Sequence, residues 1–298
     1  MTDAVRGHLA MLLFSGLIAG SFSLSSLASP YIASTAMNAL RFALAALILG
    51  VVAHLRVGLR PAQFRAPWRF VVLGGLMGFY FVTMFEGLKT EPPVSLSTVF
   101  TLTPAISGLF GYILLRQATT RRMALALSIG ALGAVWVVFR ADWQAFLAFE
   151  IGPGVALFFL GCVAHALYTP LVPRLNRGES PIAFSFGALV AATGMILVAG
   201  WSDIRATDWT SLPPIVWIAI GYTAAMATAA TFVLLQYASL RLPSAKVMAY
   251  IYLTPVWVIV WMAALGEGLP PLKLLPGVGA VLVALALLLK DEHGSQEA

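Results

Sequence analysis

The sequence predicts an all-α membrane protein whose ten transmembrane helices form two inverted repeats of five helices. Three observations lead to this class. Of the 298 residues, 60% are hydrophobic and only 10% are charged, against roughly 25% charged residues in a soluble domain. The apolar residues gather in runs of about 20, the length that crosses the hydrocarbon core of a bilayer. Finally, a segment of the second half of the chain repeats a segment of the first half.

The first five predicted helices are bounded by charged residues, Gly or Pro. Arg6 precedes the first, Arg56 follows the second, and a Pro-Pro pair opens the fourth. The five helices are expected over residues 8–25, 33–55, 68–88, 93–115 and 122–139. The first run could alternatively be a cleaved signal peptide, because a basic residue precedes it and small residues follow it. The repeat described below requires this run as a helix.

The second five predicted helices have similar boundaries. They are expected over residues 152–173, 181–200, 212–240, 243–265 and 274–289. Gly or Pro opens three of them, and Arg or Lys directly follows three of them. Runs of this length are too long for the core helices of ordinary soluble domains and too continuous for the strands of a membrane barrel.

The fourth and ninth predicted helices carry the internal repeat. Residues 92–115 align with residues 243–266 without a gap, at an offset of 151 residues, which matches Leu102-Thr103-Pro104 with Leu253-Thr254-Pro255. The chain therefore divides into residues 1–145 and 146–298, with five helices each. Because five is odd, the second copy enters the membrane from the opposite side, an arrangement found in transporters. The two matching prolines predict paired helix interruptions, which mark the central site of such proteins.

The distribution of Lys and Arg predicts the orientation. Thirteen fall on one side of the predicted bilayer: Arg6, Arg56, Arg60, Arg65, Arg69, Arg116, Arg121, Arg122, Arg174, Arg177, Arg241, Lys246 and Lys290. Four fall on the other side, Lys89, Arg140, Arg205 and Lys273, while Arg41 lies inside a helix. The positive-inside rule then places both termini in the cytoplasm. The net charge of +6 is spread between apolar runs and forms no continuous patch, so we expect no nucleic-acid partner.

The sequence lacks the motifs of common enzymes. It contains no GxxxxGK[ST] loop, no HExxH and no GxSxG, and no acidic pair lies at the centre of a predicted helix. The single cysteine, Cys162, and four widely spaced histidines exclude a disulfide and make a metal cluster unfavourable. We therefore expect no catalytic residue, no metal and no cofactor, and nothing in the sequence requires an oligomer.

Lys246 and Tyr250 form the first candidate binding pair. They lie four residues apart, about one turn into the ninth predicted helix, and so share one face of it. The Lys246 ammonium could hold a substrate carboxylate. Alternatively, Lys246 extends to the cytoplasmic headgroups of the lipids, because its helix end is near.

Two further polar residues lie deeper in predicted helices. His165, with Tyr168 three residues on, lies near the middle of the sixth helix, where it could carry a proton, read a substrate amine or simply bond across helices as a neutral side chain. Arg41 lies about a third of the way along the second helix. Its favoured interpretation is an anchor to carbonyl groups of a neighbouring helix.

The third and fourth predicted helices complete the candidate site. Glu86, with Tyr80 and Thr83 on the preceding turns, could meet a substrate ammonium at the outer mouth, or could be an exposed carboxylate at the membrane edge. Ser95, Thr98 and Thr101 recur every third residue in an otherwise apolar helix. This polar stripe favours a cavity lining over helix–helix adhesion, because interhelical hydrogen bonds contribute only about 0.6 kcal/mol each.

Several motifs together resemble a known family. They are Asn38-Ala-Leu-Arg41-Phe42, the Thr-Pro pairs of the fourth and ninth helices, and Leu265-Gly-Glu267-Gly268 ahead of a Gly-rich last helix. Over nearly its whole length the chain resembles the ten-helix EamA-type members of the drug/metabolite transporter superfamily, and it is most similar to the YddG-type amino-acid exporters.

The resemblance implies a bacterial inner-membrane exporter of amino acids, aromatic ones included, and of related small metabolites. The implied partners are a small-molecule substrate and the lipid bilayer. The implied cavity lies between the two halves and is lined by helices one, three, four, six, eight and nine. Export of drugs or other metabolites by the same fold is one alternative, and a membrane-embedded lipid-processing enzyme is an alternative from another class.

The sequence also departs from the family pattern. Arg116-Gln117 replaces the Glu that often follows the fourth helix, whereas the second half keeps Glu267. The first predicted helix contains no acid, so the proton-for-cation exchange of the small multidrug resistance relatives does not carry over to this chain.

Overall fold

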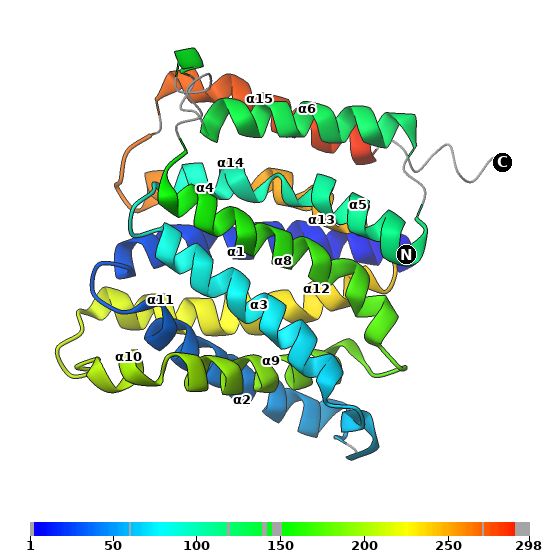
Figure 1. Ribbon diagram of the computed structural model, residues 1–298, viewed down its shortest axis with the longest axis vertical. Coiled ribbons are helices and arrows are strands. Elements are labelled where there is room, and N and C mark those ends of the chain that lie inside the picture. Colours follow the sequence, from blue (N-terminus) through cyan, green and yellow to red (C-terminus); the bar gives the residue numbers. More distant parts are fainter. Residues whose placement is uncertain are drawn as a thin grey trace.

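The computed structural model of the protein describes residues 3–59, 61–117, 120–138, 142–144, 151–269 and 271–289. Within these ranges the regular structure is helical and includes no strand, which confirms the predicted all-α class. The helices lie side by side along roughly one direction, as Figure 1 shows. Three charges used to predict the orientation, Arg60, Arg140 and Lys290, lie outside the described residues.

The first half of the chain folds into helices at all five predicted runs. They are α1 (Asp3–Ala28), α2 (Ser34–Arg56), α3 (Trp68–Gly87), the consecutive α4 (Pro93–Phe100) and α5 (Thr103–Leu115), and α6 (Arg121–Val138). A short 3-10 helix, Pro61–Phe64, precedes α3. The fourth predicted helix is thus present as two pieces.

The second half also folds as helices at its five predicted runs. They are α8 (Pro153–Leu175), α9 (Pro181–Ala199), α11 (Pro214–Ala224) with α12 (Thr231–Ser239), α13 (Ser244–Ala249) with α14 (Thr254–Ala264), and α15 (Leu275–Leu289). A π-helical segment, Ala225–Ala230, joins α11 to α12, and a 3-10 segment, Tyr250–Leu253, joins α13 to α14. The sequence did not predict the π segment or the short helix α10 (Trp201–Ala206).

Eight helical spans of the described chain are long and apolar enough to cross a membrane. They comprise α1, α2, α3, α4–α5, α8, α9, α11–α12 and α13–α14. The two remaining predicted runs are the helices α6 and α15, which are outside this set. The total of ten spans and the inverted orientation of the halves stay predictions.

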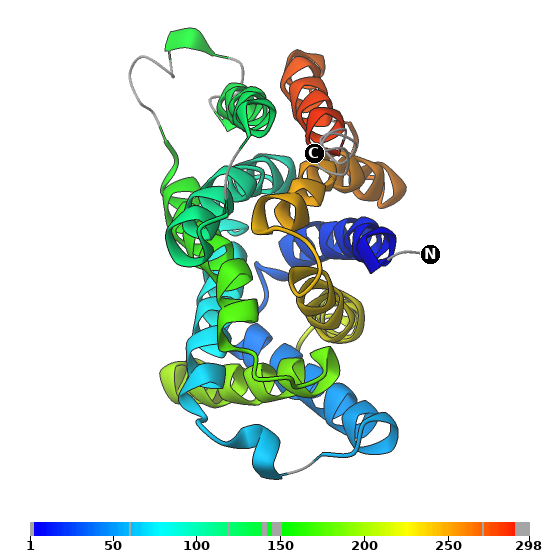
Figure 2. The ribbon, with the colours of Figure 1, turned by 90° about the vertical axis from the view of Figure 1, so that its right-hand side faces the viewer.

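The helices of the two halves pack mainly against each other. α3 packs against α8 and α9, while α1 packs against α11, α12 and α14. α6 and α15 pair at one edge of the bundle, as Figures 1 and 2 show. The start of α1 and the end of α15 lie on the same side in Figure 1. The interior of the protein is therefore the interface between its first and second halves.

Glycine allows α3 to approach its two partners closely. A Cβ atom on Gly74 would collide with the Ala188 carbonyl oxygen and lie 2.7 Å from the Ala192 nitrogen, both on α9. A Cβ atom on Gly161 of α8 would collide with the Thr83 hydroxyl of α3. Small residues at such crossings let helix backbones pack tightly within a membrane.

The paired prolines break their helices, as predicted. A proline cannot donate a backbone hydrogen bond, and its ring clashes with the carbonyl group four residues earlier. That carbonyl belongs to Phe100 for Pro104, and α4 ends at Phe100. For Pro255 it belongs to Ile251, which lies in the 3-10 segment between α13 and α14. The two halves thus carry interruptions at matching positions.

Candidate substrate site between the two halves

Ring-bearing side chains from α1, α3, α4 and α8 meet in the interior of the protein. We call them the aromatic cluster: Phe22, Tyr80, Phe100, Phe158 and His165. The centroid of the His165 ring lies 4.6 Å from that of Tyr80 and 5.0 Å from that of Phe100. Each member is at most 2% exposed. The structure therefore brings the predicted residues Tyr80 and His165 into contact, in a place closed to solvent.

The aromatic cluster contains polar atoms without hydrogen-bond partners. Within the described residues, the Tyr80 hydroxyl and the His165 Nδ1 atom have none. An unsatisfied buried polar group costs about 1–3 kcal/mol, and nearly all such groups in native proteins are paired. These two atoms can therefore donate to or accept from the polar groups of a solute that enters between the rings.

Each of the two helix interruptions carries a buried threonine hydroxyl group at the matching position. Thr103 and Thr254 each directly precede the helix-breaking proline of their half. Both are fully buried, and neither side-chain oxygen is hydrogen-bonded in the part of the chain that is described. They were absent from the predicted site residues, although their place in the repeated Leu-Thr-Pro motif is a signal that could have found them.

Tyr168 has a partner on the other side of the interface. Its hydroxyl accepts a 2.8 Å hydrogen bond from the Gln236 side chain of α12, and its ring meets Phe232 edge-on at 6.2 Å between centroids. The Gln236 side-chain oxygen has no partner among the residues described. Sequence reasoning missed Gln236, whose signal is a single amide side chain within the apolar run 212–240.

Arg41 joins α2 to the π segment. Its Nε atom donates to the Thr228 hydroxyl oxygen at 2.6 Å, and its Nη2 atom donates to the Ala227 carbonyl oxygen at 3.0 Å. The guanidinium carbon lies 3.9 Å from the centroid of the Phe81 ring. The predicted role of Arg41 as an anchor between helices is confirmed.

Lys246 lies on α13 and Tyr250 begins the 3-10 segment that follows it, and both elements pack against α1. Tyr250 is buried, and its hydroxyl lies 3.0 Å from Nδ1 of His8 on α1. The two rings are 5.8 Å apart between centroids. Lys246 is partly buried, one turn earlier on α13. His8 was not a predicted site residue, and its place near the chain's start gave no signal of this contact.

Glu86 lies at the end of α3, half exposed, where Lys89 pairs with it at 2.8 Å. The start of α13 and the end of α3 lie on opposite sides of the bundle in Figure 1. One small molecule therefore cannot touch both Lys246 and Glu86 in this conformation. Thr83, one turn before Glu86, is buried, and its hydroxyl donates to the Phe79 carbonyl oxygen at 2.9 Å.

The polar stripe of α4 is buried. The Thr98 hydroxyl donates to the Val94 carbonyl oxygen at 2.7 Å, and the Thr101 hydroxyl donates to the Thr98 carbonyl oxygen at 2.6 Å. Ser95 is buried on the same helix. In this conformation the two threonine hydroxyls satisfy backbone groups of their own turn, and their role as a cavity lining stays a prediction.

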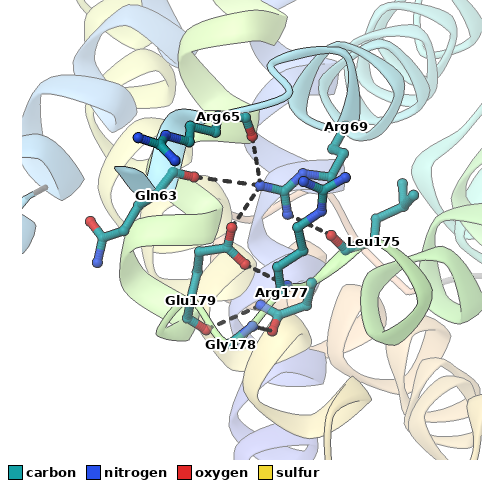
Figure 3. A network of polar contacts seen from close by, with 8 residues as sticks. Gln63, Arg65, Arg69, Leu175, Arg177, Gly178 and Glu179 are labelled. Atoms are coloured by element: carbon teal, nitrogen blue, oxygen red, sulfur yellow. Dashed lines mark hydrogen bonds and ion pairs between the residues drawn. The ribbon is translucent and has the colours of Figure 1, made fainter. Parts of the chain in front are cut away.

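A second polar network ties the two halves together at the start of α3, and Figure 3 shows it from close by. Arg69, at the start of α3, forms a buried ion pair with Glu179 at 2.7 Å. It also donates to the Leu175 carbonyl oxygen at 2.6 Å. Burial alone would raise the pKa of Glu179, but the hydrogen bonds from Arg69 and from the backbone N–H of Arg177 hold that pKa below its usual value.

Comparisons with known proteins agree with this architecture. A family model described as the EamA-like transporter family matches residues 5–139 and 152–290. A relative from Bacillus subtilis (strain 168), the uncharacterized transporter YyaM, is 24% identical over 284 residues, which is 94% of this chain and 92% of that protein. A solved crystal structure superposes with a TM-score of 0.70 at 19% identity and covers 96% of each chain.

Proposed function

The chain belongs to the EamA-like transporter family, and from this premise we propose that it exports amino acids and related small metabolites as a secondary transporter. Membership of this family and the transporter relative indicate a membrane transporter rather than an enzyme. Alternating access would open the interface between the halves first to one side of the membrane and then to the other.

The aromatic cluster carries this proposal. Its rings provide apolar walls, and the Tyr80 hydroxyl and the His165 ring nitrogen provide polar groups without partners in the described residues. Small-molecule sites combine these two features. An amino acid has the same combination, an apolar or aromatic side chain beside charged polar groups. The remaining predicted site residues, Lys246, Tyr250, Tyr168, Thr83, Glu86, Ser95, Thr98 and Thr101, would contact the solute at other stages of the cycle.

Alternating access requires two halves that exchange roles. Two separate matches to one family, residues 5–139 and 152–290, support a division into residues 1–145 and 146–298. The packing supports this division too. The third helix of the first half, α3, packs against the first helix of the second half, α8, and the third helix of the second half, α11–α12, packs against the first helix of the first half, α1. Exchanging the two halves of the chain turns each contact into the other.

We place this transporter in a bacterial inner membrane as a multi-pass protein, with both termini in the cytoplasm. The unequal distribution of Lys and Arg supports the orientation. A single chain contributes all helices of the proposed route, so transport would not depend on an oligomer.

Counterflow in proteoliposomes tests the function. Vesicles that contain only the purified protein are loaded with unlabelled amino acids, and entry of the labelled amino acid is measured. We expect exchange of amino acids with large apolar side chains, and a marked loss of exchange in His165→Ala. His54→Ala is the matched control, because His54 is exposed near the end of α2. Exchange of other metabolites but of no amino acid would favour the wider metabolite or drug exporter instead.

A further inference from the structure

Arg41 is a buried cation without a counter-charge. It is fully buried and lies two turns into α2. Across the described residues it forms no ion pair with an acidic side chain, and the acids within candidate spans, Asp3 and Glu86, lie at helix ends and pair with Arg6 and Lys89. A charge within a membrane is costly unless an opposite charge or a set of dipoles compensates it.

The protein uses only part of the guanidinium group. Nε and Nη2 donate to Thr228 and Ala227, as described above. The Nη1 atom has no hydrogen-bond partner within the part of the chain that the structure describes. The Arg41 side chain is held in place by the π segment and the Phe81 ring, and its buried Nη1 group remains able to donate a hydrogen bond to a ligand.

The Phe81 ring, which Arg41 covers, contacts a residue with a second unused donor. Tyr80 lies beside Phe81, with 4.7 Å between ring centroids, and the guanidinium carbon of Arg41 lies 3.9 Å from the centroid of the same Phe81 ring. The Tyr80 hydroxyl is also unpartnered among described residues and completely buried. Tyr80 belongs to the aromatic cluster as well, so the Tyr80–Phe81 pair contacts both Arg41 and the proposed substrate site.

We propose that Arg41 Nη1 and the Tyr80 hydroxyl together bind the carboxylate group of the transported solute. This inference rests on the proposed function and adds the substrate class, a carboxylic acid whose apolar part lies among the rings of the aromatic cluster. Guanidinium groups suit carboxylates because charge-assisted hydrogen bonds are shorter and stronger than neutral ones. The anchor on the π segment holds the cation in place before the solute arrives.

Thermal unfolding of the purified protein in detergent tests binding without transport. The probes are sodium acetate and sodium benzoate at fixed ionic strength, with sodium chloride as the arm for a free inorganic anion. We expect a saturable rise of the unfolding temperature with the carboxylates. Arg41→Gln should weaken the apparent affinity about tenfold or more, and Tyr80→Phe should weaken it several-fold. The exposed Arg241→Gln should leave it unchanged, because a surface guanidinium remains hydrated.

Two outcomes of the thermal-unfolding experiment would overturn the proposed carboxylate site. A carboxylate response that Arg41→Gln leaves intact overturns the site, as does a chloride response equal to that of benzoate. If Arg41→Gln does not fold, Tyr80→Phe applies the same criterion, because it removes only a hydroxyl. Counterflow of an amino acid against its amide then separates the two proposals. Carboxylate binding without amino-acid exchange refutes the function alone, while exchange with an unchanged preference for acid over amide in Tyr80→Phe refutes the site alone.

Discussion

Two arginine side chains are fully or almost fully buried in the described protein, and they differ in what balances their charge. Arg69 faces the Glu179 carboxylate at 2.7 Å, whereas Arg41 is held by a hydroxyl and a carbonyl group. Removing one partner of a buried ion pair strongly destabilises the protein, because the other charge stays buried and unpaired. The two arginines should therefore respond differently to pH and to added anions.

The Arg69–Glu179 pair should make stability depend on acid pH. The pKa of Glu179 is lower in the folded protein than in the unfolded chain, so the stabilisation is complete above the unfolded pKa and is lost as pH falls through the folded pKa. We expect the unfolding temperature to drop below about pH 4.5 in wild type. Glu179→Gln should lower the free energy of unfolding by about 3 kcal/mol at neutral pH. The unfolding temperature of this variant should also vary less with pH in the acid range. The same acid sensitivity in wild type and Glu179→Gln would assign it to other carboxyl groups.

Lys246 offers a prediction about binding. If its ammonium contacts the solute, Lys246→Ala removes a charge-assisted hydrogen bond of about 1.5–3 kcal/mol and weakens affinity by roughly ten- to a hundredfold. Lys246→Arg should keep most of the affinity, since it retains a cation at the same turn of α13. The concentration dependence of counterflow measures this. Unchanged affinity in a well-folded Lys246→Ala protein would show that the side chain only reaches toward the headgroups.

At the scale of the helix, the close crossing of α3 and α9 depends on the absence of a side chain at Gly74. Gly74 faces the α9 backbone, whereas a Cβ atom on the adjacent Gly75 would lie 3.4 Å from the flexible end of Met195. Gly74→Ala should therefore lower stability by about 1–3 kcal/mol through overpacking. Gly75→Ala should have little effect or stabilise, because Ala favours helix over Gly by up to about 1 kcal/mol. Thermal unfolding of the two variants measures this difference. Equal decreases of the unfolding temperature in Gly74→Ala and Gly75→Ala would contradict the close crossing of α3 and α9.

The sequence predicted the helices and their interruptions well, because length, apolar content and proline act locally. Pro104 and Pro255 break their helices wherever the rest of the chain lies. Contacts such as Tyr168 with Gln236, or Tyr250 with His8, join residues 68 and 242 positions apart. No local pattern encodes which face of one helix meets another, so these partners could not be predicted. The sequence did assign Lys246 and Glu86 to opposite sides of the membrane, and the corresponding ends of α13 and α3 lie on opposite sides of the bundle in Figure 1.

For the whole molecule, the orientation is the property that a labelling experiment decides directly. Cys162 is the only cysteine and is completely buried, so the wild type should give little background with an impermeant thiol reagent. Single cysteines at the exposed positions Arg65 and Asp208 should differ in intact cells. We expect labelling from outside at position 208 but protection at position 65, with both accessible after lysis. Labelling of position 65 in intact cells would reverse the predicted orientation.

The π segment between α11 and α12 sets the rotation of one part of the bundle against another. Its i→i+5 bonding accommodates an extra residue, and each residue turns an α-helix by about 100°. If Ala225–Ala230 became regular α-helix with no residue removed, α12 would turn by about 100° relative to α11 and Gln236 would turn away from Tyr168. Tyr222, whose hydroxyl donates to the Leu17 carbonyl oxygen at 2.9 Å, would keep α11 fixed to α1 meanwhile. This segment should therefore accept exchanges among small residues that keep its i→i+5 bonding, and an insertion of one further residue should separate Gln236 from Tyr168.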